Sequence, residues 1–519
     1  MSIGPAVGNI GWFAASLPEL RRFKRDAKDL EAAQVARLRQ YLSVNANTAF
    51  GRQHGFADIR DFSQYAQRVP PRNYEDLQPW IKRIAKGEGE VLSIDPVRLF
   101  EPTSGSSGAA KLIPFTKSLQ REIRLAVAVW AAQNFIMQPN LFLGRAYWSL
   151  TPQMPPAQTD SVVPIGFDAD SAYLGGVAQR LINLALVSDP TLRDERDMDR
   201  FWHSTLLMLL LCDDLRLVSV WHPSFLSLLV EKLRKHWPSL LRDLAGRAPA
   251  RAGFLQDCGC DDLRQIWPKL QLISCWADGH AKESIPGIET LFPGVAIQPK
   301  GLMATEGVIT LPLANHRPLA IRSHVFEFLD ENGNVFAPWQ LQQGQEYSVL
   351  LTTGGGLYRY QLGDRVAVDE FYRQVPSLRF LGRDKQVSDY FGEKLNETFV
   401  AGLLDELLST YGLQPRFSML ALDDSRSPPA YVLFLETEAA IPDALAAQLE
   451  AKLSENPHYG LCVRLGQLGE AQISRIRGNG FEIYSNRLAR KGLRIGDIKP
   501  TPLSRYSGWS RFFDAGGKD

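Results

Sequence analysis

A loop rich in serine and glycine lies near residue 105, between a charged residue and an apolar, strand-like run. The stretch EPTSGSSGAAKLIPFT, residues 101–116, contains Ser104, Gly105, Ser106, Ser107 and Gly108, and Lys111 follows them. Backbone amides and hydroxyls of small residues can wrap phosphate oxygens, and a lysine adds positive charge. The loop lacks both the GxxxxGK[ST] spacing of a Walker loop and the GxGxxG spacing of a dinucleotide fingerprint. From this loop alone, a phosphate cradle and an ordinary Ser/Gly connector both stay open.

Two further segments carry acidic residues after strand-like runs. Thr305 and Glu306 follow such a run in VAIQPKGLMATEG, and Asp364 follows a glycine-rich turn in LYRYQLGD. Taken singly, Glu306 could cap a helix and Asp364 could belong to a turn. Such local roles do not account for the order in which these two segments, and then FLGRDKQV, follow the serine-rich loop. The order therefore favours the phosphate cradle.

The elements that must position these residues require more than one domain, because 519 residues exceed the usual size of a single core. Strand-like and helix-like runs alternate from RAYWSLT to VAIQP, which predicts an α/β domain with a mainly parallel sheet. Ligands bind such sheets at the carboxyl ends of the strands. Strand pairs from HVFEFLDENGNVF onward predict a β-rich part, and a smaller α+β module follows. We place the hinge near 383–388 and the domains at 1–384 and 385–519.

Several segments have apolar residues at helical spacing, and the longest of them follows the serine-rich loop. Helices are predicted over 28–45, from Tyr74 onward, over 118–135, and in DRFWHSTLLMLLLC and SFLSLLVEKLRKHW. The run IGWFAASL near the N-terminus is shorter than a membrane span, and its basic residues come after it. We expect a short surface helix there that docks on the body of the protein.

Composition excludes several classes of protein. Apolar residues make up 45% and charged residues 22% of the chain, as in soluble globular proteins. The 58 basic and 57 acidic residues nearly cancel, so we expect no nucleic-acid partner. Five cysteines without a metal-ligand pattern indicate reduced thiols and a cytoplasmic protein. We expect no membrane association and a monomer.

The ordered motifs resemble the adenylate-forming superfamily of acyl-activating enzymes. TSGSSGAAK is similar to its phosphate loop, ATEG to its Thr-Glu motif, YRYQLGD to its ribose-binding motif, and GRDKQVSDYFGEKLNE to its hinge motif. Within it, VNANTAFGRQHGF, RVPPRNYEDLQPWIKRIAKGEGEVL and the ending GDIKPTPLSRY resemble the Gretchen Hagen family of auxin-responsive acyl acid amido synthetases, in its bacterial branch. The resemblance covers nearly the whole chain.

This resemblance implies a large N-terminal adenylation domain with mixed and parallel sheets and a small, mobile α+β C-terminal domain. It implies a ligase that activates a carboxylic acid with ATP and Mg²⁺ as an acyl adenylate, which an amino acid or another amine then attacks. A coenzyme A ligase with the same first step, or a non-catalytic nucleotide-binding relative, are the alternatives. A coenzyme A enzyme should carry a basic docking patch, and none stands out in the sequence.

The resemblance also implies roles for individual residues. Ser104 through Gly108 would wrap the β- and γ-phosphates, with Lys111 in support. Thr305 would bind the α-phosphate, and Glu306 would hold Mg²⁺, which prefers carboxylate oxygen. Tyr360 and Asp364 belong to the ribose motif, and Arg383 could share the ribose hydroxyls with Asp364.

The adenine side departs from the superfamily pattern. An aromatic residue often stands three or four positions before the motif glutamate, where this chain has Leu302 and Met303. The loop SCWADGHAK resembles the adenine-side loop, so Trp276, Asp278 and Gly279 are candidates for that wall. Core packing is the competing interpretation of Trp276.

The C-terminal module offers two candidates for a catalytic lysine. Lys394 in FGEKLNE resembles the hinge-proximal lysine of the plant enzymes, and Lys499 in GDIKPTP lies where the late lysine of the superfamily would be. We favour Lys394, because its motif is easier to align. Either could instead be an ordinary solvated charge.

The acid would bind beside the predicted helix 118–135 and the segment WHPSFLSLL. Trp130, His222 and Phe225 are our candidates for the acid-binding wall. Each could equally be a core residue. The sequence identifies neither the acid nor the amine.

Overall fold

The computed structural model describes residues 3–103, 111–149, 161–166, 182–193, 195, 197–383, 387–490 and 500–514. The chain divides into two compact units. The first contains Met1–Pro102 and Leu112–Asp384, and the second contains Thr103–Lys111 and Lys385–Asp519. The two are described separately below.

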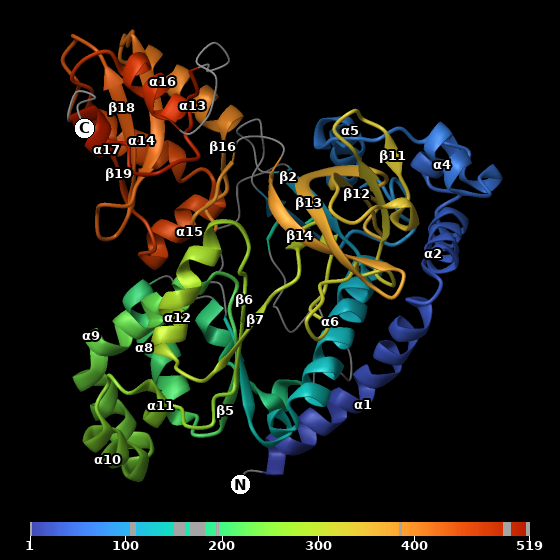
Figure 1. The fold of residues 1–519 in the computed structure, drawn as a ribbon, viewed down its shortest axis with the longest axis horizontal. Helices are drawn as coiled ribbons and strands as arrows, with labels where there is room; N and C mark the ends of the chain where they lie inside the picture. Colours follow the sequence, from blue (N-terminus) through green and yellow to red (C-terminus); the bar gives the residue numbers. More distant parts are fainter. Residues whose placement is uncertain are drawn as a thin grey trace. The chain divides into compact units, whose positions relative to one another are not determined.

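Helices near the N-terminus form one wall of the first unit. Helix α1 is longer than the short helix expected from the sequence, and it packs along α6, as Figure 1 shows. Helix α6 begins after Thr116, whose side chain accepts a hydrogen bond from the Leu119 amide. The elements of this part are α1 (Ile3–Asp26), α2 (Leu30–Val44), α3 (Ala49–Gln53), α4 (Phe62–Arg68), α5 (Tyr74–Ala85), β1 (Leu99–Thr103), β2 (Lys111–Phe115) and α6 (Lys117–Met137).

A parallel sheet forms the centre of the α/β part. Its strand order is β4-β3-β5-β6-β7, and every neighbouring pair is parallel. Helices lie on both sides of it in Figure 1, because its strands carry buried apolar residues on both faces. The elements are β3 (Arg145–Trp148), β4 (Leu186–Val187), α8 (Met198–Leu211), β5 (Leu215–Ser219), α9 (Pro223–Arg247), α10 (Pro249–Cys258), α11 (Leu263–Ile266), β6 (Leu272–Cys275), α12 (Ile285–Leu291) and β7 (Ala296–Pro299).

An antiparallel sheet of order β11-β10-β12-β13-β14 completes the first unit. The turn after β10 contains Asn332 and Gly333, and Gly333 adopts φ +82°, as its place in a tight turn requires. The elements are the hairpin strands β8 (Met303–Ala304) and β9 (Gly307–Val308), then β10 (Val325–Leu329), β11 (Val335–Phe336), β12 (Glu346–Thr352), β13 (Tyr360–Tyr372) and β14 (Val375–Arg383).

The second unit is a small α+β module. Strand β18 pairs antiparallel with β17 and parallel with β19, and its apolar residues pack on the helices. A separate pair joins β15 to β16. The elements are β15 (Val387–Ser388), β16 (Leu395–Asn396), α13 (Glu397–Thr410), β17 (Phe417–Asp423), β18 (Ala430–Glu436), α14 (Ala444–Leu453), α15 (Pro457–Leu465), β19 (Gly469–Arg475), α16 (Gly480–Arg490) and α17 (Ser510–Asp514).

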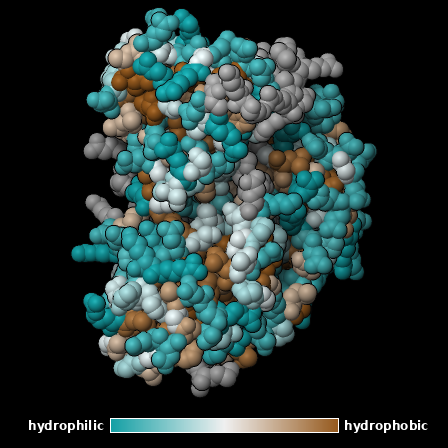
Figure 2. Space-filling view, turned by 60° about the vertical axis from the view of Figure 1, so that its left-hand side comes forward, coloured by the Kyte–Doolittle hydropathy of each residue, from teal (hydrophilic) through white to brown (hydrophobic). Residues whose placement is uncertain are grey.

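The surface carries few large hydrophobic patches on the face that Figure 2 shows. Hydrophilic residues dominate there, and hydrophobic ones lie in small separated groups. Among the described helices, none combines the length and the apolar character needed to cross a bilayer.

Candidate active site

Thr305 and Glu306 form the turn of a short hairpin. Met303 pairs with Val308 and Ala304 with Gly307, so the two motif residues lie between β8 and β9. The Glu306 residue is only 7% exposed. The hairpin therefore sets the position of the Glu306 carboxylate. Because each of its strands has only two residues, contacts with neighbouring elements must hold it in place.

His324 supplies that support. Its Nε2 accepts the Val308 backbone N–H at 3.0 Å, and its Nδ1 lies 3.0 Å from Oε2 of Glu122. A neutral imidazole that accepts at Nε2 carries its proton on Nδ1, so this N–H lies next to the Glu122 carboxylate. A side chain at Gly307 would place its Cβ 2.7 Å from His324 Nε2, so only glycine fits.

Glu122 of α6 connects this hairpin to a second loop. Its carboxylate also accepts the Gly354 backbone N–H at 3.1 and 3.0 Å and the Tyr41 hydroxyl at 2.7 Å. Glu122 and His324 are 3% and 0% exposed. One buried carboxylate therefore holds the hairpin of Glu306 and the turn that precedes the ribose motif.

The residues of the YRY segment are each anchored. The Tyr358 hydroxyl donates to the Leu92 carbonyl at 2.7 Å, and Arg359 Nε donates to Glu327 at 2.8 Å. Burial raises the pKa of Glu327, and the positive charge of Arg359 opposes that rise. Arg359 adopts φ +49°, an uncommon conformation for a residue with a side chain. These contacts fix the start of β13.

Tyr360 brings two of the predicted motifs together. Its hydroxyl lies 3.3 Å from Oε1 of Glu306, and Tyr360 itself is 1% exposed. Four residues farther along β13, Asp364 is buried and lies opposite Arg383 of β14 as its Cα partner. The structure thus joins the Thr-Glu motif to the YRYQLGD motif, and the YRYQLGD motif to the predicted hinge residue.

The loop after β6 contacts the same antiparallel sheet. The Trp276 ring meets that of Phe380 edge-on with centroids 5.5 Å apart, and it is partly buried against the core. The Asp278 carboxylate accepts two contacts from Arg317, at 2.7 and 2.8 Å. Asp278 is therefore engaged in an ion pair, and Gly279 begins a short 3₁₀ helix after it. Their place on the adenine side stays a prediction.

Lys300, which no sequence motif singled out, lies beside Trp130, one of the candidates for the acid-binding wall. It follows β7 at the carboxyl edge of the parallel sheet, and its Nζ donates to Ser219 Oγ at 2.7 Å. The ammonium lies 5.3 Å from the ring centroid of Trp221 and 6.0 Å from that of Trp130. The signal in the sequence was a lysine directly after a predicted strand, six positions before Glu306 in the same connection.

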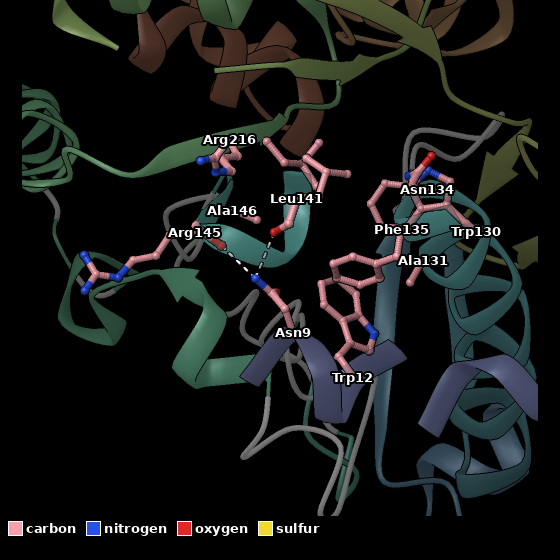
Figure 3. Close-up of a pocket in the computed structure, with 12 residues that line it drawn as sticks. Asn9, Trp12, Trp130, Ala131, Asn134, Phe135, Leu141, Arg145, Ala146 and Arg216 are labelled. Carbon is pink, nitrogen blue, oxygen red and sulfur yellow. Dashed lines mark hydrogen bonds between the residues drawn. The ribbon is translucent and has the colours of Figure 1, made fainter. Parts of the chain in front are cut away.

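Trp130 forms part of an aromatic cluster. Figure 3 shows it with Phe135 near Trp12 of α1, around a cavity of about 20 Å³, which has room for a single water. Its Nε1 donates to Gln298 Oε1 at 2.7 Å. The Trp130 residue is 9% exposed, so little of its surface is available to a ligand.

His222 and Phe225 have local structural partners. The His222 Nδ1 accepts the Ser224 amide at 3.2 Å and caps α9. The Phe225 ring lies 5.0 Å from the ring of Trp202, and the residue is buried. These contacts are those of a helix cap and a core side chain, and a role for either residue in acid binding stays a prediction.

Family models identify the chain. The GH3 family N-terminal domain matches residues 19–251, the GH3 family central domain matches 318–383, and the GH3 family C-terminal domain matches 405–507. The chain belongs to the GH3 family. This is the family that the sequence motifs resemble, and its assignment to a bacterial branch stays a prediction.

Curated relatives of this GH3 protein are named as amido synthetases. Indole-3-acetic acid-amido synthetase GH3.3 of Arabidopsis thaliana is 23% identical over 547 residues, which cover 92% of this chain and 90% of that protein. Indole-3-acetic acid-amido synthetase GH3.15 of the same plant is 26% identical over 487 residues, which cover 80% and 79%.

Solved structures confirm the fold. AtGH3.15 acyl acid amido synthetase in complex with 2,4-DB superposes with a TM-score of 0.65 at 20% identity, covering 96% of this chain and 95% of that one. 2-Hydroxyisobutyryl-CoA ligase in complex with 2-HIB-AMP and CoA superposes with a TM-score of 0.57 at 14% identity, covering 93% and 91%. The α/β class predicted from the sequence is therefore correct.

Part of the predicted site of this GH3 protein lies outside the described residues. These are Ser104, Gly105, Ser106, Ser107, Gly108 and Lys499. Lys111 is the first residue of β2, and Arg383 is described only by its backbone position in β14. Lys394 lies in the second unit, between β15 and β16.

Proposed function

We propose that this GH3-family ligase uses ATP to activate a carboxylic acid as an acyl adenylate and then transfers the acyl group to an amino acid or another amine. The contact between Tyr360 and Glu306 carries the proposal, because it unites two motifs of an adenylation site that are separated along the chain. The family match and the names of the curated relatives support the same reaction.

The chemistry requires an activated acid. A free carboxylate is a poor acylating agent because oxide is a poor leaving group, whereas adenosine monophosphate leaves readily. The protein must therefore align the acid with the α-phosphorus and stabilise negative charge on the phosphate. We assign Thr305 to the α-phosphate and the serine-rich loop to the outer phosphates.

Glu306 has the chemistry of a magnesium ligand. Carboxylate oxygen is the ligand type that Mg²⁺ prefers, and the turn holds this carboxylate near the Tyr360 hydroxyl. In the described ranges, no group of His, Cys, Asp and Glu residues could hold a metal by itself. This fits an ion held by one carboxylate together with substrate phosphates. When bound, the ion would neutralise phosphate charge.

Asp364 is our candidate for the ribose hydroxyls. A buried carboxylate can accept hydrogen bonds from both hydroxyls of a ribose, and Asp364 is 2% exposed at the start of the sheet. Arg383, its Cα partner on β14, would share this task. Because Arg383 ends β14 and 383–388 is the predicted hinge, ribose binding would be linked to the position of the C-terminal domain.

We place the acid at the carboxyl edge of the parallel sheet, beside Lys300. The Trp221 residue is 48% exposed, Lys300 lies over its ring, and Ser219 binds the Lys300 ammonium. An indole face offers a flat apolar surface, and an ammonium attracts an anion. This combination favours a flat, apolar carboxylic acid. Lys300 lies in the short segment that connects β7 to β8, and Glu306 follows β8. The proposed acid site and the proposed magnesium ligand would therefore belong to one stretch of the chain.

The C-terminal unit would supply the catalytic lysine. Lys394 adopts φ +48° in the segment between β15 and β16, and Lys499 stays the second candidate. We assign the boundary of the mobile domain to residue 385, as the sequence suggests.

One experiment tests the reaction. Purified protein is incubated with MgATP and a panel of carboxylic acids, with and without amino acids or coenzyme A, and pyrophosphate is measured. We expect pyrophosphate only with a suitable acid, and an amide product only when an amino acid is added. Release of ADP and phosphate would contradict adenylation. A thioester instead of an amide would make coenzyme A the acceptor.

A further inference from the structure

A fully buried carboxylate organises the segment that carries Lys394. This segment connects β15 to β16, which pair through Val387 with Asn396 and Ser388 with Leu395. Glu393, the residue before Lys394, is 0% exposed. A carboxylate without access to solvent is costly unless several donors satisfy it, so its partners indicate what it holds in place.

The partners of Glu393 are the backbone of its own turn and one strand. Its Oε1 accepts the Tyr390 N–H at 2.9 Å, and its Oε2 accepts the Phe391 N–H at 2.7 Å. The Tyr431 hydroxyl of β18 donates to Oε1 as well. While Glu393 is ionised, that phenol gives its single proton to the carboxylate, and the Ser388 hydroxyl then donates to the Tyr431 oxygen. The carboxylate thereby clamps the turn to the sheet of the second unit.

The turn that is clamped has an unusual backbone. Gly392 has φ +102° and Lys394 has φ +48°, a left-handed conformation that costs a residue with a side chain about 1 kcal/mol or more. The Lys394 carbonyl accepts a hydrogen bond from Asn456 Nδ2 at 3.2 Å. Such conformations persist where surrounding contacts impose them, and they are concentrated at functional sites.

We propose that Glu393 is a positioning residue for adenylation, which acts by holding the turn that presents the Lys394 ammonium. The inference rests on the proposed function with Lys394 as the catalytic lysine of the C-terminal unit, and we assign that lysine to the adenylation step. A lysine side chain has several rotatable bonds and gains precision only from a fixed backbone. The carboxylate of Glu393 ties the residue just after Gly392 to the two backbone amides just before it, those of Tyr390 and Phe391.

The surroundings of Glu393 disfavour its ionised form, so the buried carboxylate lowers the stability of the fold when it is charged. Burial and the charge of Asp389 raise the pKa of Glu393 to about 7, while the hydrogen bonds from the turn and from Tyr431 oppose the rise. Tyr459 and Cys462 also face this region, and burial raises the pKa of the Cys462 thiol. A glutamine of similar size would avoid the burial of a charge. It could not accept hydrogen bonds at both of its terminal atoms.

The test is a double-mutant cycle on the separate half-reactions. Single-turnover rates of adenylate formation, and of amide formation from a chemically supplied acyl adenylate, are measured for wild type, Glu393→Gln, Lys394→Ala and the double variant. Tyr431→Phe removes one donor from the clamp and serves as a milder second variant. Glu438→Gln is the matched control, because the Glu438 side chain is 88% exposed in the same unit.

We expect Glu393→Gln to slow adenylation about 10- to 100-fold, as a misplacement near 1 Å can do, and to spare amide formation. Tyr431→Phe should have a smaller effect of the same kind. In the Lys394→Ala background neither change should slow adenylation further, because the positioned group is absent. The unimpaired amide step shows that the variants are folded.

Four results would overturn the inference. Three concern Glu393→Gln: a wild-type adenylation rate, an equal loss in both half-reactions, or a loss that multiplies with that of Lys394→Ala. The fourth is wild-type adenylation in Lys394→Ala, although the proposed reaction would then stand. Failure of the proposed function is recognised separately, because wild type would then release no acid-dependent pyrophosphate.

Discussion

The hydroxyl of Tyr360 lies 3.3 Å from Oε1 of Glu306 and is the direct link between the Thr-Glu hairpin and the strand that carries Asp364. This distance is at the long end for an O–H···O hydrogen bond. Catalytic hydrogen bonds are often long before substrate binds. The contact therefore predicts how each partner responds to substitution.

Tyr360→Phe should weaken the hold on the Glu306 carboxylate. A typical hydrogen bond contributes about 1 kcal/mol, and the length of this one offsets the gain from the charged acceptor, so adenylation should slow roughly fivefold and require more Mg²⁺ for half-maximal rate. Pyrophosphate release across a Mg²⁺ titration measures both effects. Tyr358→Phe is the control, because its hydroxyl bonds the Leu92 carbonyl instead. It should lower stability and leave the Mg²⁺ requirement unchanged, and a Mg²⁺ effect in both variants would contradict the assignment.

Glu306→Gln should slow adenylation about 100-fold or more, because it removes the proposed metal ligand with little change in size. The measurement is the single-turnover rate of pyrophosphate release with saturating acid. Glu346→Gln is a suitable control, since the Glu346 side chain is half-exposed and pairs with Arg365. A Glu306→Gln protein as fast as wild type would remove this residue from the site.

Substitutions of His324 should separate the two contacts of its ring. Asparagine can keep an N–H near Glu122 but does not reach the Val308 amide, whereas glutamine can place its carbonyl near that amide. We expect His324→Asn to slow adenylation about tenfold and His324→Gln to slow it less, because the hairpin of Glu306 loses its anchor only in the first. Denaturant unfolding of both variants is the control for stability. The reverse order of rates would contradict this role.

Lys300→Met should raise the KM for the acid about tenfold or more and leave the KM for ATP unchanged. The change keeps the length of the side chain and removes the ammonium that bonds Ser219. Hydrogen bonds to charged groups contribute about 1.5–3 kcal/mol, which sets this scale. Lys300→Arg keeps the charge, so its KM for the acid should lie between those of wild type and Lys300→Met. If only the KM for ATP rose, the acid would not bind beside Lys300.

The raised pKa of Glu393 should make the free energy of unfolding depend on pH. Its pKa is raised from the ordinary 4.5 to about 7 by burial and by Asp389, so the folded chain keeps a proton that the unfolded chain loses. Its stabilising contribution is complete below pH 4.5, falls as the pH rises, and is lost above about 7. Nearby Tyr431 and Cys462 stay neutral in this range because burial raises their pKa values.

The measurement is denaturant unfolding of wild type and Glu393→Gln between about pH 4 and pH 8, two values that bracket the transition. Stability of wild type relative to the variant should fall across this range, because glutamine does not titrate. A difference that is constant, or that grows with pH, would contradict the raised pKa of Glu393.

The sequence determined the elements and the order of the motifs. Helical spacing predicted 118–135 within α6 (Lys117–Met137) and 28–45 around α2 (Leu30–Val44), because periodicity and capping residues are local signals. Alternating strands and helices predicted the parallel sheet. The family resemblance of the motifs implies that Glu306 and Asp364 belong to one nucleotide site, and the hydrogen bond of Tyr360 to Glu306 is consistent with that prediction.

Only the tertiary structure decided which residues hold these motifs in place. Gly354 and Glu122 are 232 positions apart in the chain, and Lys300 and Ser219 are 81 apart, so no local pattern links them. Phe225 and Trp130 turned out to pack against other aromatic rings, which spacing along a helix does not distinguish from ligand contact. A sequence encodes where the backbone turns and which faces are apolar. Which buried donor meets which acceptor depends on how distant elements pack, and that is fixed only when the chain is folded.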